Sequence, residues 1–86
     1  MKFLLISFTS RNDVYFFANI LKRNNITISI INTPKVVGSS CTLSIRTNFE
    51  NFQQIAQLIN NYKPKSFQGV YSISASNYST QSIKLI

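Results

Sequence analysis

The chain has 86 residues and a formal net charge of +7, with nine basic and two acidic side chains. This length allows one small domain, and the charge favours anionic partners such as nucleic acid, an acidic protein surface or an anionic membrane. One cysteine excludes an internal disulfide, and without histidine it cannot build a four-ligand zinc site. The lack of histidine and the separation of Asp13 from Glu50 argue against self-contained acid–base or nucleophilic catalysis. We therefore expect a non-enzymatic protein without a metal or cofactor.

The first part of the chain predicts a strand, a helix and a second strand. Residues 2–9 form an apolar run that is typical of a buried strand. Ser10 and Asp13 have the S-x-x-D spacing of a helix start, and apolar residues then recur at i, i+3, i+4 and i+7 to about Arg23. Residues 26–30 alternate apolar and polar with period two, which predicts a half-buried strand.

A proline separates the second strand from a loop. Pro34 ends the strand because proline cannot donate a hydrogen bond to the ladder. The loop over residues 35–40 contains Gly38, which is free to adopt unusual dihedral angles. Residues 42–46 alternate again and predict a third strand.

The remaining periodic segments predict a second helix and a fourth strand. Thr47 and Glu50 form a T-x-x-E capping box, and the apolar pattern after it predicts a helix to about Asn61. Residues 67–73 predict the last strand, which Gly69 interrupts at a bulge.

The order of these elements predicts an α+β fold. A β-α-β-β-α-β order favours a ferredoxin-like sandwich, in which one four-stranded antiparallel sheet carries both helices on one face. We expect residues 1–73 to form this single domain and residues 74–86 to form a tail that is flexible, docks on a partner or adds an edge strand. The other face of the sheet is expected to be polar and open, and its residues include Thr27, Ser29, Thr42 and Ser44.

RNA-recognition modules share this order of elements, and they place aromatic residues on the exposed face of the middle strands. The expected third strand has Leu43 and Ile45 on one face and Thr42 and Ser44 on the other. The required aromatic residues are missing there, and no run of five basic residues occurs. The sequence therefore argues against nucleic acid as a partner.

Cys41 is the candidate functional residue. The thiolate is the reactive form of cysteine, and nearby positive charge favours it, so Lys35 and Arg46 are the candidate cations. Backbone N–H groups and hydroxyls of the loop are expected to donate hydrogen bonds to the anion. The residues expected to do so are Gly38, Ser39 and Ser40. The competing interpretation is that Cys41 is a small buried residue without a chemical role.

The segment around Cys41 resembles a known family. Thr33-Pro34-Lys35, Ser39-Ser40-Cys41 and Leu43-Ser44-Ile45-Arg46 match the motif of small selenium/sulfur carrier-like proteins, and the resemblance covers about residues 2–73. Thr42 stands where members usually have glycine. The resemblance implies that Cys41 accepts sulfur or selenium as a persulfide or selenosulfide, and that a donor or acceptor protein is the partner.

The alternative is a small basic binding or assembly subunit. In that case the basic surface and the 74–86 tail dock on an acidic subunit of a larger complex, and Cys41 is incidental. No segment has the ~20 consecutive apolar residues of a membrane-spanning helix. We expect a cytoplasmic or plastid-stroma location, because the composition is typical of the AT-rich genomes of plastids and some bacteria.

Overall fold

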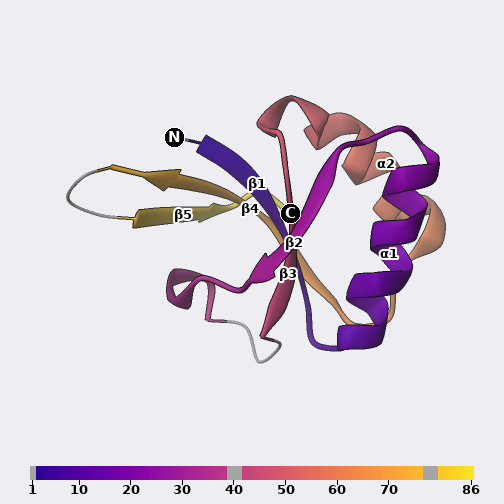
Figure 1. Ribbon diagram of the computed structural model, residues 1–86, viewed down its shortest axis with the longest axis horizontal. Helices are drawn as coiled ribbons and strands as arrows, with labels where there is room; N and C mark the ends of the chain where they lie inside the picture. The colour runs from indigo at the N-terminus through magenta and orange to yellow at the C-terminus, as the bar shows by residue number, and fades with distance from the viewer. Residues whose placement is uncertain (1, 39–41, 77–79) are drawn as a thin grey trace.

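The computed structural model describes residues 2–38, 42–76 and 80–86, and these ranges contain two α-helices, two 3₁₀ helices and five strands (Figure 1). In chain order the elements are β1 (Lys2–Phe8), α1 (Arg11–Arg23), β2 (Ile28–Asn32), η1 (Lys35–Val37), β3 (Leu43–Thr47), η2 (Phe49–Asn51), α2 (Phe52–Tyr62), β4 (Phe67–Ala75) and β5 (Thr80–Lys84). The strands form one sheet in the order β2-β3-β1-β4-β5, and neighbouring strands are antiparallel. The predicted α+β class is confirmed.

The prediction of a four-stranded sheet was wrong, because β5 adds a fifth strand at one edge. It pairs with β4 from Thr80 opposite Ala75 to Lys84 opposite Tyr71. Beyond it, the Leu85 amide donates to the Val70 carbonyl at 2.7 Å. Most side chains of β5 are exposed, and its sequence does not show the alternation of apolar and polar residues that marks a half-buried strand. The backbone pairing with β4 defines this strand, and the pattern of its side chains does not predict it.

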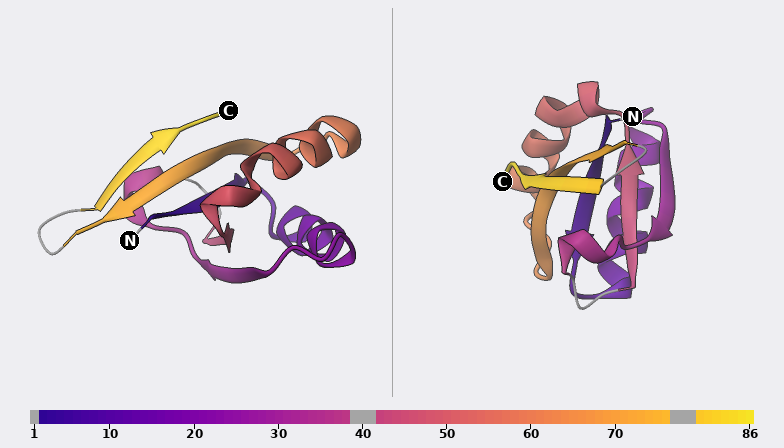
Figure 2. Two further views of the ribbon diagram at one scale, coloured as in Figure 1. Left: turned by 90° about the horizontal axis from the view of Figure 1, so that it is seen from above. Right: turned by 90° about the vertical axis from the view of Figure 1, so that its left-hand side faces the viewer.

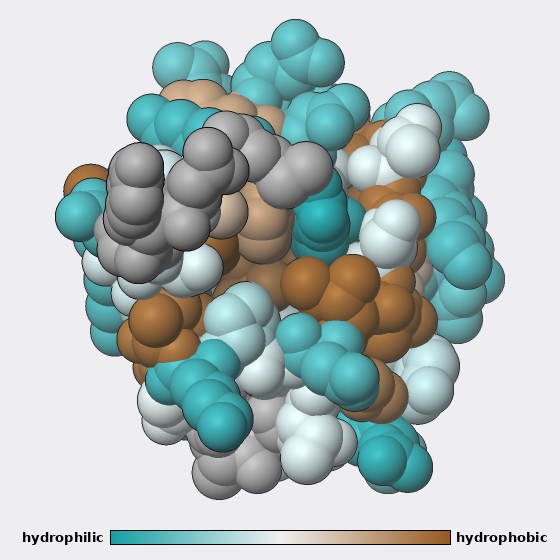
Figure 3. Space-filling model, turned by 60° about the vertical axis from the view of Figure 1, so that its left-hand side comes forward, coloured by the Kyte–Doolittle hydropathy of each residue, from teal (hydrophilic) through white to brown (hydrophobic). Residues whose placement is uncertain are grey.

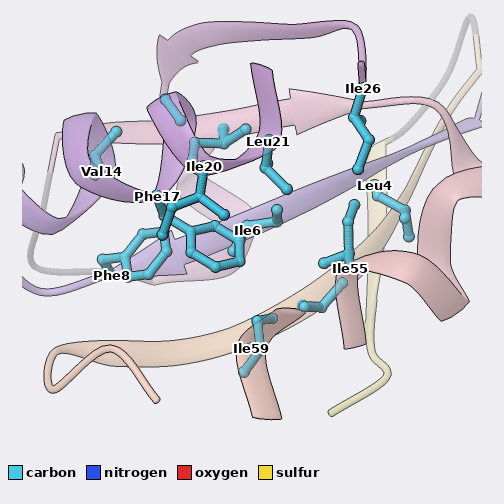
Figure 4. Packing of buried hydrophobic residues seen from close by; sticks show 13 residues of the cluster. Leu4, Ile6, Phe8, Val14, Phe17, Ile20, Leu21, Ile26, Ile55 and Ile59 are labelled. Atoms are coloured by element: carbon cyan, nitrogen blue, oxygen red, sulfur yellow. The ribbon is translucent and has the colours of Figure 1, made fainter. Parts of the chain in front are cut away.

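The large core lies between the sheet and both helices. Leu4, Ile6 and Phe8 of β1 join one buried cluster with apolar residues of α1 and α2, so the two helices pack on the same face of the sheet. Figure 4 shows labelled side chains of α1 and α2, among them Phe17, Leu21 and Ile55, gathered with those of β1. The Phe8 ring lies 5.8 Å from the Phe17 ring and 6.1 Å from the Phe67 ring, centroid to centroid. Each fully buried side chain of this size contributes about 1.5–3 kcal/mol.

The opposite face of the sheet is less polar than the sequence predicts. Phe3, Leu5 and Ile73 form a second buried cluster there, and Val37 of η1 packs against it. Ser44, which we expected to face water, is fully buried. The prediction failed because it considered only the strands that became β2 and β3; β1, in the middle of the sheet, is apolar on both faces.

The first predicted helix has the expected bounds but a different start. Ser10 occupies the N-cap position, yet its side chain makes no capping hydrogen bond. Asp13 instead accepts two hydrogen bonds from Ser66, from the amide at 3.1 Å and from the hydroxyl at 2.5 Å. The helix ends before Asn25, which has a left-handed φ of 60° and so provides the predicted stop.

The second predicted capping box is not formed. Thr47 is the last residue of β3, and its hydroxyl donates to the Thr27 carbonyl at 2.8 Å. The Asn51 side chain donates to the same hydroxyl at 3.0 Å. The Thr47 side chain thus connects β3 with the segment between α1 and β2, and it is not available to cap a helix. Helix α2 begins five residues later, after η2.

Gly69 lies at the predicted bulge and beside the C-terminal residues. Ser7 pairs with Gly69 while Phe8 pairs with Phe67, so β4 has an extra residue at this point. A Cβ atom on Gly69 would lie 2.8 Å from Lys84 Cε and 2.9 Å from the Ile86 carbonyl oxygen. The Lys84 side chain can move away, whereas the backbone carbonyl of Ile86 is held by its bond from the Val70 amide. Gly69 therefore permits the close approach of the chain beyond β5.

We predict that Gly69→Ala displaces the C-terminal residues and lowers the free energy of unfolding by about 1–3 kcal/mol, the usual cost of overpacking. Urea unfolding measures this loss, and hydrogen exchange should show faster exchange of the Leu85 amide. Gly38→Ala is the control: no atom lies within 4 Å of its added Cβ, so any cost comes from its φ of +69°. Unchanged exchange at Leu85 in Gly69→Ala would contradict this account.

Candidate functional site

Hydrogen bonds join the two chain segments that precede and follow the candidate thiol, at the end of β2 and the start of β3. The Thr33 amide donates to the Thr42 carbonyl at 2.8 Å. The hydroxyl oxygens of Thr33 and Ser44 lie 2.6 Å apart, and Ser44 is 0% exposed. The end of β2 and the start of β3, which flank the segment with Cys41, are therefore joined by hydrogen bonds.

Three of the predicted site residues, Ser39, Ser40 and Cys41, lie outside the described residues. The geometry of the candidate site is therefore that of the residues on either side of them. Gly38 precedes them and Thr42 follows them, and both are exposed.

The chain approaches Cys41 through η1, which the sequence did not predict. The Val37 amide donates to the Pro34 carbonyl at 3.1 Å, and the Gly38 amide donates to the Lys35 carbonyl at 3.2 Å. Gly38 has a φ of 69°, in the left-handed region that favours glycine, as expected from its place in the loop. Lys35 is exposed on the first residue of this turn.

The turn η1 is attached to the open face of the sheet at two points. Val37 packs against the second cluster, and the Ser82 hydroxyl donates to the Val36 carbonyl at 3.3 Å. Figure 2 shows η1 close to β5. Figure 3, which shows this side of the molecule, has separate hydrophobic areas divided by hydrophilic side chains. Ser82 was not a predicted site residue, because its segment has no motif that links it to the loop.

Arg46 belongs to the sheet face. Its guanidinium carbon lies 4.2 Å from the centroid of the Phe3 ring, in a cation–π contact. Arg46 is opposite Leu5 on one side and Ser29 on the other. It follows Thr42 by four residues, which corresponds to about 13 Å along a strand. The two predicted cations therefore occupy different settings, Lys35 in the loop and Arg46 on the sheet.

Two other cations lie at the end of the sheet where β2 ends and β3 begins. The antiparallel register places Ile6 opposite Ile45, so the end of β1 lies beside the start of β3. Arg11 follows the end of β1, and Lys65 precedes the start of β4 at this same end; both are exposed. Neither residue is near Cys41 in the sequence, so they come to this end of the sheet only through the pairing of the strands.

The described parts of the chain contain no group of three or more His, Cys, Asp or Glu side chains that could hold a metal ion. Neither α-helix in these parts is long and apolar enough to cross a membrane.

We predict that Thr33→Val loosens the base of the loop. Ser44 is buried and loses its hydroxyl partner, so the free energy of unfolding should fall by about 1–3 kcal/mol. Thr80→Val, which changes an exposed residue on β5, is the matched control. The double variant Thr33→Val/Ser44→Ala should recover part of the loss, because it no longer buries an unpaired hydroxyl. Urea unfolding of the three variants tests this, and a Thr33→Val protein as stable as the unmodified chain would show that the hydroxyl pair has no such role.

One protein family matches most of the chain. The family described as "Putative Se/S carrier protein-like" matches residues 3–72, which include β1 to most of β4 and the whole β2–β3 segment. No curated protein and no solved structure matches the chain. The match extends over more than half of the chain, and the protein therefore belongs to the Se/S carrier-like family.

Proposed function

We propose that this protein carries sulfur or selenium on Cys41 and has no enzymatic activity of its own. The observation that supports this most directly is the family match, because it spans the segment from Thr33 to Arg46. The structure adds a reason why that segment suits a carrier. Within it, the Thr33 amide is hydrogen-bonded to the Thr42 carbonyl, and Gly38 and Thr42, the described residues nearest to Cys41 on either side, are exposed.

The proposed transfer is a thiol–persulfide exchange. The Cys41 thiolate attacks the terminal sulfur of a persulfide on a donor protein. A sulfur–sulfur bond forms on Cys41 as the donor's sulfur–sulfur bond breaks, and the donor leaves as a thiolate. The sulfur keeps its oxidation state, so no oxidant or reductant is consumed. The same exchange with selenium leaves a selenosulfide on Cys41, and an acceptor protein reverses the step.

The groups proposed to favour the thiolate are those expected from the sequence. Lys35 is supported by its exposed position in η1, and Gly38 by the backbone turn that it permits before Cys41. Arg46 is proposed to act at longer range from the sheet face. Ser39 and Ser40 complete the proposed set as hydroxyl donors.

We also infer that residues 1–73 form a ferredoxin-like domain. The strand order β2-β3-β1-β4 and the position of both helices on one face support this, and β5 is then an addition to its edge. The 74–86 segment is proposed to support η1 through Ser82.

Intact-mass analysis tests the carrier function. After incubation with a cysteine desulfurase and cysteine, the unmodified chain should gain the mass of one sulfur atom, and dithiothreitol should remove it. Cys41→Ser is the matched control and should gain nothing. Equal labelling of both proteins would refute the proposal. In that case the assembly role is favoured, with the 62% exposed Ile83 of β5 as a contact for the partner.

The rate of alkylation by iodoacetamide tests the proposed cations. A positive charge near a thiol stabilises the thiolate, so the Cys41 pKa should lie below the usual value of about 8.5. Lys35→Ala should raise that pKa and lower the rate at pH 7 by about two- to fivefold, the range for exposed charge pairs. Arg46→Ala should have a smaller effect because of its distance along β3. A Cys41 pKa at or above about 8.5 in the unmodified chain would contradict the proposed activation.

A further inference from the structure

The turn between α2 and β4 is fastened to the start of α1. The Asp13 carboxylate accepts hydrogen bonds from the Ser66 amide and hydroxyl. The Ser66 hydroxyl also accepts from the Ser10 amide at 3.2 Å, and the Ser66 carbonyl accepts from the Thr9 amide at 2.8 Å. These four bonds hold the turn in a fixed position relative to α1.

An exposed pair of aromatic rings bridges the two helices beside this turn. Phe16 of α1 and Tyr62 of α2 lie 6.5 Å apart, centroid to centroid, with a near-perpendicular angle of 77°. Both side chains are 52% exposed. Figure 1 shows α1 and α2 on the same side of the molecule, away from the β4–β5 hairpin. The pair therefore lies on the surface, where its uncovered ring faces are accessible.

Two exposed lysines follow this ring pair in the chain. Lys63 follows Tyr62 directly, Lys65 lies two residues further on, and both are exposed. The carboxylate of Asp13 is held by Ser66 and is only partly exposed. We call the surface formed by these residues the turn patch: Phe16, Tyr62, Lys63 and Lys65.

We propose that the turn patch binds single-stranded nucleic acid. Exposed aromatic faces stack on unpaired bases, and neighbouring cations neutralise the phosphates. The pI of about 10.0 agrees with an anionic ligand of this kind. An acidic protein surface would satisfy the lysines but would offer few planar groups to the two rings. The aromatic residues that RNA-recognition modules need are missing from β3 of the sheet, whereas this patch lies on α1, at the end of α2 and in the turn that follows it. The proposal does not depend on Cys41.

Fluorescence anisotropy with the full chain and labelled single-stranded RNA or DNA tests the proposal. We expect a dissociation constant of about 10⁻⁴–10⁻⁶ M, with log K falling by about 0.7 per log unit of salt for each phosphate neutralised. Lys63→Ala/Lys65→Ala should therefore reduce the salt slope by about 1.4. Lys22→Ala/Lys84→Ala has the same net charge but changes exposed residues outside the patch, and it should largely retain the slope.

Phe16→Leu/Tyr62→Leu tests the stacking separately. This variant keeps apolar side chains but removes the planar faces, so binding should weaken by about tenfold while the salt slope stays the same. Thermal unfolding by circular dichroism checks that each variant is folded. Cys41→Ser should bind like the unmodified chain, which separates this proposal from the carrier function.

Three results would overturn the proposal. The first is no binding of RNA or DNA at low salt. The second is equal weakening by the two lysine variants, which would mean that binding reflects net charge alone. The third is unchanged affinity in the Leu variant, which would mean that the two rings do not stack on bases. Binding of either RNA or DNA supports the proposal, and the ratio of their affinities identifies the ligand.

Discussion

The structure depends on the burial of β1 on both faces. All six residues from Phe3 to Phe8 are buried, and β1 lies between β3 and β4 in the middle of the sheet. Alternate side chains of a strand point to opposite faces, so Leu4, Ile6 and Phe8 pack against the two helices, while Phe3 and Leu5 belong to the second cluster. A chain of 86 residues can bury only a limited surface area. A strand whose apolar residues contribute to clusters on both faces of the sheet increases the area that is buried.

The second cluster connects β1 with the proposed carrier segment. Because Val37 covers Phe3, Leu5 and Ile73, the turn that leads to Cys41 is held against the sheet by hydrophobic contact. The Ser82 hydroxyl adds a hydrogen bond from β5 to the same turn. The family match ends at residue 72, before β5 begins. This chain therefore supports the turn with a strand that lies outside the matched region.

The positive charge of the chain is divided between two kinds of position. Lys2 and Arg46 lie over the rings of Phe49 and Phe3, at 4.1 and 4.2 Å from the ring centroids, so part of each side chain contributes to packing. Lys63 and Lys65 are exposed at the turn before β4. The composition gives only the total charge. The positions of these side chains decide which cations stabilise the fold and which are presented to a ligand.

The sequence by itself determined the α+β class, both helices and the approximate positions of four strands, because these features follow from the local periodicity of apolar residues. It also identified the segment that the family match covers. Only the tertiary structure decided the fifth strand, since β5 is held by its backbone ladder and has exposed side chains. The same holds for the hydrogen bond from the Thr47 hydroxyl to the Thr27 carbonyl and for the hydroxyl pair of Ser44 and Thr33, whose partners are 20 and 11 residues apart in the chain. Local patterns cannot report such contacts, because they exist only once strands and turns from distant parts of the chain lie side by side.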